Sequence, residues 1–350
     1  MSAALRTVLG DVPAHQMGIT LPHEHLRTDS SVWFQPSEHE YSHCEPALHN
    51  LWWMRQYPNS NPSVLRLTDE DLVVEELEPF RDLGGRTVIE LTTVGLGRDV
   101  SALASMASRT GLQIVAGTGH YVQAAHAPGV AQASIDELAA DMVDEITNGV
   151  ADTGIRCGVI GEIGISYPIH PDEAKVLSAA ALAQRQTGAA IAVHTAAHRP
   201  DVDSALDVAD ILESAGADLS RVVMAHLDTS LHRPDYHRRV AERGCIVEYD
   251  LFGHEFFESE NAFQSFGDTE RVHAVAALIA DGYGTQLLLS HDICYLIQLR
   301  SYGGYGYAHL LQNISARLAL MGIDNAALLS LMVDNPARIF PLATSEASES

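Results

Sequence analysis

The feature that most constrains the fold of this 350-residue chain is a repeated alternation between short apolar runs and longer stretches with helical spacing. Each short run is rich in Val, Ile and Leu, as a strand buried on both faces would be. The eight runs begin at Met17, Arg86, Leu112, Cys157, Ala189, Arg221, Cys245 and Gln286. This alternation predicts α/β architecture, with βα units and a parallel sheet. We therefore predict a single (β/α)8 TIM barrel domain over residues 1–350.

The segments between the runs carry helix signals and one exception. SIDELAADMVDEITNG, from Ser134, has the order of a capping box, and DEAKVLSAAALAQRQTG, from Asp172, stops at Gly188. The exception is a long stretch without periodicity, about residues 27–66, which we expect to form an aromatic insertion loop after strand 1. It holds all three tryptophans. A lid or binding loop, an aromatic satellite core and a subunit contact are all compatible with this composition.

The charge of the chain excludes several classes of partner. Asp and Glu number 46 against 21 Lys and Arg, and the resulting formal charge of −25 repels phosphate backbones and anionic lipid surfaces. No apolar run reaches the roughly 18 residues of a membrane span, and the amino terminus has no signal-peptide pattern. We expect a cytoplasmic protein that acts on a small molecule, without nucleic-acid or membrane partners, and a homodimer as the commonest oligomer.

Ligand-type side chains stand at the ends of the predicted strands. The first strand ends in His23, Glu24 and His25, and residues two apart on a strand point to the same side. Both imidazoles can therefore face one metal ion. The pattern is weak by itself, because the chain contains 18 histidines.

The same feature returns at four later strands. Glu162, His194 and His226 follow one another at intervals of 32 residues, and Asp292 follows 66 residues later, which is two further steps. Because the carboxyl ends of barrel strands meet at one mouth, these residues should converge with the HxH pair. Four imidazoles and two carboxylates suit two divalent ions, Zn²⁺ first, with Mn²⁺, Co²⁺ or Fe²⁺ as alternatives. No organic cofactor is expected.

At this point the sequence resembles a known family. The motifs that carry the resemblance are GITLPHEHL at Gly18, VIGEIG at Val159, AVHT at Ala192, MAHLD at Met224, LSHD at Leu289, GGYGYAHLL at Gly303 and DNPARIF at Asp334. In order and spacing they resemble the phosphotriesterase-like branch of the amidohydrolase superfamily, from about Leu9 to Phe340. Within it the chain is most similar to the phosphotriesterase-related and phosphotriesterase-homology proteins.

The resemblance implies a division of the ligands between two metals. It assigns His23, His25 and Asp292 to the more buried ion and His194 and His226 to the more exposed one, with Glu162 as the bridge. Many relatives use a carboxylated lysine as that bridge. Here the position holds Glu162, and the only lysine, Lys175, lies in the following helical stretch, so a modified lysine is excluded by composition.

Two metals about 3.5–4 Å apart can share a hydroxide and polarise a substrate oxygen, which predicts hydrolysis. Asp292 would take the proton of the hydroxide and pass it to the leaving group. Asp228, two residues beyond His226, is expected to orient a ligand or relay that proton, or else to cap the next helix. The resemblance gives Tyr121 a contact with the substrate carbonyl, with packing as the alternative.

The preferred function is cleavage of a carbonyl-centred bond in an ester, lactone or amide. We expect neutral or weakly charged substrates, because Leu296 and Ile297 stand where relatives often carry a cation. Phosphoester or phosphotriester hydrolysis is the alternative, since it uses the same metals. A barrel that binds a ligand without catalysis is a third reading, which the complete set of six ligands disfavours.

Overall fold

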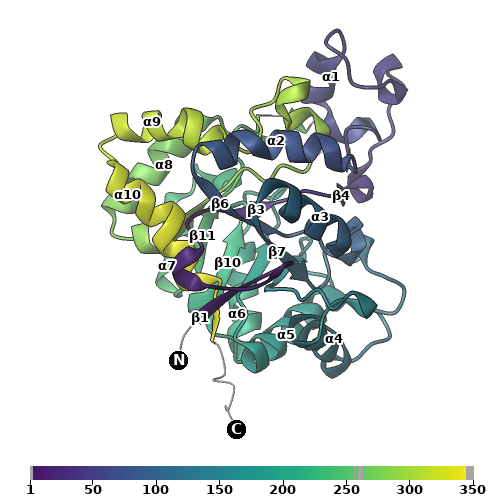
Figure 1. Cartoon of the computed structure of the whole chain (residues 1–350), viewed down its shortest axis with the longest axis vertical. Helices are drawn as coiled ribbons and strands as arrows, with labels where there is room; N and C mark the ends of the chain where they lie inside the picture. The colour runs from purple at the N-terminus through teal and green to yellow at the C-terminus, as the bar shows by residue number, and fades with distance from the viewer. Residues whose placement is uncertain (1–2, 256, 259–262, 344–350) are drawn as a thin grey trace.

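A computed structural model describes residues 3–255, 257–258 and 263–343 of the chain. Its centre is an eight-stranded parallel sheet in the order β14-β11-β10-β9-β8-β7-β6-β3, coiled into a barrel and surrounded by helices (Figure 1). The strands are β3 (Ile19–Glu24), β6 (Gly85–Glu90), β7 (Gln113–Thr118), β8 (Val159–Gly164), β9 (Ile191–His194), β10 (Val222–Ala225), β11 (Ile246–Tyr249) and β14 (Leu287–Leu289). Each coincides with one of the eight apolar runs to within one residue, so the predicted TIM barrel is confirmed.

Two apolar layers hold the barrel together. The inner layer fills the barrel with one side chain from each of several strands, such as Ile89, Val115 and Val159. The outer layer packs the opposite strand faces against the helices, so every strand is buried on both sides. The covering helices are α2 (Glu70–Asp82), α3 (Val100–Thr110), α4 (Ile135–Thr147), α5 (Pro171–Thr187), α6 (Ser204–Ser214), α7 (Pro234–Glu242) and α8 (Asp268–Ala280).

Local signals explain where these helices begin and end. The Ser134 side chain accepts a hydrogen bond from the main-chain NH of Glu137 and the Glu137 side chain accepts one from that of Ser134, which is the predicted capping box of α4. Gly188 ends α5 in the left-handed conformation, with φ of 73°.

The amino-terminal end of the barrel is covered by a small sheet that the sequence analysis did not predict. Strands β1 (Ala3–Thr7), β2 (Gly10–Pro13) and β15 (Leu342–Ala343) form this antiparallel sheet in the order β15-β1-β2. Leu5 packs into the inner layer, and the main-chain NH of Val8 donates to the carbonyl of Ile114 at 2.9 Å. The opposite, carboxyl-terminal end of the strands is therefore the open end.

The expectation that residues 27–66 lack structure was wrong in part. The segment contains β4 (Thr28–Asp29) paired with β5 (Arg66–Leu67), helix α1 (Leu51–Gln56) and several 3-10 turns. Trp53, Met54 and Leu65 form a satellite core with Tyr295 and Ile297 of the loop after β14. These contacts anchor the insertion, which includes α1, at the open end of the barrel (Figure 1).

The remaining elements complete the chain. They are β12 (Phe257–Glu258) and β13 (Phe263–Gln264), which pair with each other, and helices α9 (Ser315–Leu320), α10 (Asn325–Leu329) and α11 (Asn335–Ile339). Within the described residues, no helix combines the length and the apolar character needed to cross a membrane.

Candidate active site

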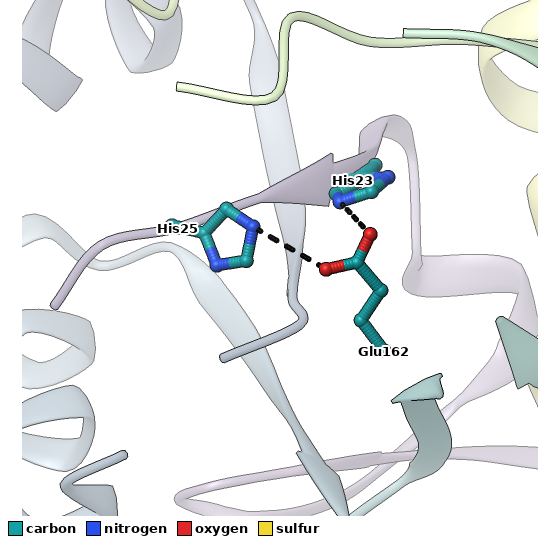
Figure 2. Close-up of side chains that lie close together, drawn as sticks. All are labelled: His23, His25 and Glu162. Carbon is teal, nitrogen blue, oxygen red and sulfur yellow. Dashed lines mark ion pairs between the residues drawn. The ribbon is translucent and has the colours of Figure 1, made fainter. Parts of the chain in front are cut away.

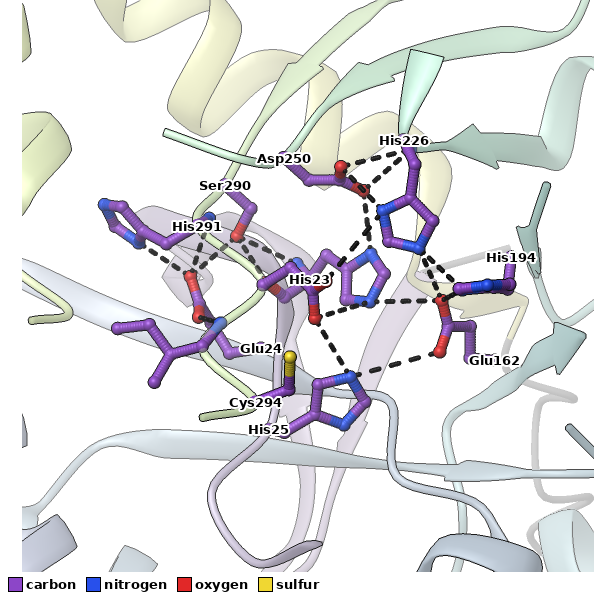
Figure 3. Close-up of polar contacts among 12 residues, drawn as sticks. His23, Glu24, His25, Glu162, His194, His226, Asp250, Ser290, His291 and Cys294 are labelled. Atoms are coloured by element: carbon purple, nitrogen blue, oxygen red, sulfur yellow. Dashed lines mark hydrogen bonds and ion pairs between the residues drawn. The ribbon is translucent and has the colours of Figure 1, made fainter. Parts of the chain in front are cut away.

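Six side chains from five strands meet at the open end of the barrel, as the spacing argument expected. Figure 3 labels all of them except Asp292. His23 and Glu162 lie within β3 and β8, and His194 is the last residue of β9. The other three, His25, His226 and Asp292, lie just beyond the ends of β3, β10 and β14. All six are buried. Sequence positions separated by up to 269 residues thus form one polar cluster.

One group of ligand atoms surrounds Glu162 from the side of β3. His23 Nε2 lies 3.5 Å from Glu162 Oε1, and His25 Nε2 lies 4.0 Å from Glu162 Oε2 (Figure 2). Asp292 Oδ1 closes the group at 3.2 Å from His25 Nε2 and 3.7 Å from His23 Nε2. Ligand atoms on one tetrahedral Zn²⁺, each at about 2.0–2.1 Å from the ion, are about 3.3 Å apart. These spacings therefore suit one divalent ion.

A second group shares the same carboxylate. Glu162 Oε1 lies 2.9 Å from His194 Nδ1 and 3.0 Å from His226 Nε2, and the two imidazole nitrogens are 2.7 Å apart. This group is compatible with a second ion. Glu162 belongs to both of these groups, as expected of a bridging ligand, and His23 and His226 also form a third candidate group with Asp250.

The chemistry of the donors fits metal ions. Within the described residues, the buried His23 Nε2 has no hydrogen-bond partner although it faces Glu162. Burial opposes a charge on His23 and His226, yet the carboxylates around them raise the pKa of both imidazoles well above the ordinary value. Burial likewise opposes ionisation of Glu162, but His194 and His23 lower the pKa of its carboxyl well below the usual range. The site therefore carries a negative potential that attracts cations.

Asp250 orients one histidine of each group. Its carboxylate lies 2.9 Å from His23 Nδ1 and 3.0 Å from His226 Nδ1, and it also accepts the main-chain NH of His226 at 3.1 Å. Hydrogen bonding at Nδ1 leaves Nε2 of each ring free to face the cluster. Asp250 is not among the site residues predicted from the sequence, although its place at the carboxyl end of the apolar run that begins at Cys245 was an available signal.

A second set of hydrogen bonds holds His25. Its Nδ1 donates to the hydroxyl of Thr92 at 2.8 Å, and that hydroxyl donates in turn to the buried carboxylate of Glu90. Neither Thr92 nor Glu90 was recognised from the sequence, because the contact depends on the pairing of β3 with β6.

Two of the six clustered residues adopt backbone conformations that ordinary residues avoid. His226 has φ of 60° and Asp292 has φ of 48°. Such left-handed conformations cost roughly 1–3 kcal/mol and are concentrated at functional sites. Gly161, just before Glu162, has φ of 132°, and a Cβ there would meet the carbonyl oxygen of Ala192 at 2.3 Å. Glycine is thus required for the close approach of β8 and β9 beside Glu162.

The placement of Asp228 corrects the sequence analysis. β10 ends at Ala225, and because His226 is left-handed, Asp228 lies in a 3-10 turn rather than on the strand face that carries His226. Its Oδ2 accepts from Arg271 Nε at 2.7 Å and from the main-chain NH of Leu251 at 3.0 Å. Asp228 therefore neither caps the next helix nor contacts the six clustered side chains. It links its own turn and the loop after β11 to α8.

Tyr121 lies at the cluster. Its hydroxyl is 3.1 Å from His194 Nδ1 and accepts a hydrogen bond from Trp33 Nε1 at 3.3 Å. Burial, together with the charges of Glu162 and Asp292, raises the pKa of Tyr121 well above its ordinary value, so the hydroxyl keeps its proton. It is available as a donor. Trp33 was part of the predicted aromatic segment but was not singled out.

A cavity opens above the cluster. Apolar and aromatic side chains form much of its wall, including Trp33, Leu96, Leu251 and Tyr295. The described lining contains no Lys or Arg. Leu296 and Ile297, where a cation was considered, do not line it, and Ile297 packs in the satellite core instead.

Comparisons with known proteins agree with this geometry. The model of the phosphotriesterase family matches residues 3–340. A phosphotriesterase-related protein of Nematostella vectensis is 37% identical over 96% of this chain and 97% of its own length. N-acetyltaurine hydrolase of Mus musculus is 38% identical, with the same coverage.

Two solved structures show the same fold. A resiniferatoxin-binding protein from Rhodobacter sphaeroides superimposes with a TM-score of 0.94 at 36% identity, over 96% of this chain and 94% of that one. The lactonase Lmo2620 from Listeria monocytogenes superimposes with a TM-score of 0.79 at 26% identity, over 97% and 100%. The similarity thus extends over nearly the whole of each chain.

Proposed function

The chain belongs to the phosphotriesterase family and is a metal-dependent hydrolase, and on that basis we propose that it uses two divalent metal ions to cleave a carbonyl-centred bond in an ester, lactone or amide. The observation that carries the proposal is the position of Glu162, whose carboxylate lies within 4.0 Å of two separate pairs of histidines. Zinc is the first candidate for both ions, because imidazole and carboxylate donors suit it.

Each residue has a proposed role. His23, His25 and Asp292 would hold one ion, His194 and His226 the other, and Glu162 would bridge them. Bound ions of this kind polarise a carbonyl oxygen and lower the pKa of water, which supplies the Lewis-acid part of a hydrolysis. Asp292, which lines the cavity, would accept the proton of the attacking water and return it to the leaving group.

Tyr121 is proposed to donate a hydrogen bond to the oxygen of the scissile carbonyl. Its hydroxyl accepts from Trp33 and so has its proton to give, and it lines the cavity beside His194. Asp228 is not proposed as a proton relay, because it is paired with Arg271.

An amide is the bond we favour. The mouse relative is an N-acetyltaurine hydrolase, and cleavage of an acetyl amide needs the same polarised carbonyl and the same proton transfer to a leaving nitrogen. A sulfonate, however, is a permanent anion, and the described cavity lining offers no Lys or Arg to pair with it. We therefore propose that the substrates are neutral or weakly charged N-acyl amides with an apolar amine part. We also propose that the enzyme is a homodimer and acts in the cytoplasm.

The test pairs metal analysis with a substrate panel. Protein purified without chelator should contain close to two divalent ions per chain, and fully active protein with one ion would contradict the two-ion site. Rates on N-acyl amides, lactones and aryl esters should exceed those on phosphotriesters by at least about tenfold in kcat/KM, equivalent to about 1.4 kcal/mol. If phosphotriesters or phosphate monoesters react faster, phosphoester hydrolysis replaces this proposal. If metal-loaded protein binds these compounds but hydrolyses none of them, the chain is a ligand-binding barrel and not a hydrolase of this panel.

A matched pair of substrates separates the charge question. N-acetyltaurine and the acetyl amide of a neutral amine of similar length share the scissile bond and differ in the anionic group. We expect the neutral amide to have the higher kcat/KM, and the reverse order would contradict the charge argument. Tyr121→Phe should lower kcat on both substrates to a similar degree, because it removes a contact with the carbonyl that they share.

A further inference from the structure

The carboxylate between the two histidines of the HxH motif has no role in the proposed function. Glu24 is fully buried, and its neighbours in the chain, His23 and His25, are two of the six clustered side chains. Its own side chain points away from the cluster, toward Ser290 and His291 of the loop after β14 (Figure 3). We propose that Glu24 is the positioning residue of Asp292, whose backbone it clamps on both sides.

The first reason is the way in which the barrel closes. β14 and β3 stand at the two ends of the strand order, and within the described chain they form no register pairs with each other. The main-chain NH of Asp292 donates to the carbonyl of His23 at 3.2 Å, which is one direct contact across this seam. Side-chain hydrogen bonds must therefore take the place of a backbone ladder where Asp292 is placed.

The second reason is the number and position of the donors to Glu24. Oε1 lies 3.1 Å from the main-chain NH of His291 and 2.7 Å from its Nδ1. Oε2 lies 3.0 Å from the main-chain NH of Ile293. The residues immediately before and after Asp292 thus donate to the two oxygens of one carboxylate, which fixes the peptide on each side of it.

The third reason is conformational. Asp292 has φ of 48°, a conformation that costs roughly 1–3 kcal/mol and persists only where neighbours enforce it. Charge-assisted bonds to a buried carboxylate are among the stronger ones a protein can make. The clamp by Glu24 is therefore strong enough to hold the unfavourable turn that aims Asp292 at His25 and His23.

The tautomer of His291 supports the same role. The main-chain NH of Leu310 donates to His291 Nε2 at 3.0 Å, so Nε2 is an acceptor and the ring proton is on Nδ1, facing Glu24. Ser290 also lies in the seam: its hydroxyl accepts from the main-chain NH of His23 at 3.1 Å and lies 2.7 Å from the carbonyl oxygen of His23 and 2.9 Å from Glu24 Oε1. His291 thus presents a donor to Glu24 rather than contributing to the metal cluster.

The inference rests on the proposed role of Asp292 as a metal ligand, and Glu24→Gln tests it. The substitution keeps the shape but replaces one acceptor oxygen with a donor NH₂ group, which opposes one of the flanking NH groups. We expect the variant to retain about one metal ion per chain in place of two and to lose on the order of 100-fold in kcat, the effect of a misplacement of about 1 Å. KM should change less than about threefold.

Glu76→Gln is the matched control. Glu76 is also buried and also accepts main-chain NH groups of the loop after β14, those of Arg300 and Ser301, but it flanks no metal ligand. This control should keep both ions and a kcat within about threefold of wild type. If Glu24→Gln keeps two ions and wild-type kcat, or if Glu76→Gln loses as much, the positioning role is overturned.

Two further variants keep the test decisive. Should Glu24→Gln fail to fold, His291→Gln removes the Nδ1 donor while leaving the Glu24 carboxylate, and it should lower kcat about tenfold and weaken binding of one ion; an unchanged variant overturns the proposal. Asp292→Asn separates the two levels of inference. If that variant retains both ions, the proposed role of Asp292 itself fails, whereas loss of an ion in Asp292→Asn but not in Glu24→Gln refutes only the role of Glu24.

Discussion

Asp250 offers the sharpest test of how the proposed ligands are oriented, because its carboxylate contacts one histidine of each proposed metal ion. It lies 2.9 Å from His23 Nδ1 and 3.0 Å from His226 Nδ1. Although burial opposes its ionisation, these two imidazoles hold the pKa of Asp250 well below its usual range. Asp250→Asn would retain one acceptor oxygen and place an NH₂ group against the second ring, so at least one histidine loses its orientation.

The expected magnitude follows from the number of contacts. Removal of an outer hydrogen-bond partner of a metal-binding histidine typically costs about 10–100-fold in metal affinity, or about 1.4–2.7 kcal/mol. Because Asp250 serves both groups, both ions should bind more weakly in Asp250→Asn. The assay is metal content after equilibration against a series of chelators of increasing affinity, followed by activity measurement at saturating metal, where much of the loss should be recovered.

Asp268→Asn is the control for this experiment. Asp268 is also buried and also bonds a histidine, His309 Nε2 at 2.7 Å, but that histidine is not part of the cluster. The Asp268→Asn variant should bind both ions with wild-type affinity. Wild-type affinity for both ions in Asp250→Asn, or an equal loss in Asp268→Asn, would refute the reasoning.

Three further predictions concern the bridge, a buried ion pair and acid stability. Glu162→Ala should lose bound metal and nearly all activity, and added bicarbonate should not affect reconstitution of wild type; a bicarbonate requirement would count against a glutamate bridge. Arg271→Met should lower the free energy of unfolding by about 3–5 kcal/mol in urea titrations, because it strands the fully buried Asp228, and Asp228→Leu in the same chain should restore most of it. Burial and neighbouring cations lower the pKa of His237 to about 3, so the imidazole stays neutral in the folded protein. The unfolded chain takes up a proton near pH 6.5, and the free energy of unfolding therefore falls by about 1.4 kcal/mol per pH unit as the pH drops from 6.5 toward 3. His237→Gln should reduce that slope in unfolding measured from pH 6.5 to 4.5, and an unchanged slope would contradict the assignment.

The sequence by itself determined the barrel and indicated which side chains meet at its open end. Strand and helix periodicities are local properties, and the carboxyl ends of parallel barrel strands must meet at one mouth, so His25, Glu162, His194, His226 and Asp292 could be brought together from their spacing alone. The resemblance to a family added the division between two ions. Both inferences needed only residue type and position along the chain.

Only the tertiary structure decided how these ligands are held. Glu24 meets His291 across 267 residues of sequence, and His23 meets Asp250 across 227. A carboxylate has no periodicity, and which donors surround it depends on the order and register of the closed barrel. The left-handed turn at His226 is equally invisible in sequence, because any residue can be forced into it by its neighbours, and that turn removed Asp228 from the expected face. Residues 27–66 fold for the same reason: Trp53 packs with the loop after β14 and Trp33 packs with Leu96 and Tyr121, and no local pattern could indicate these partners.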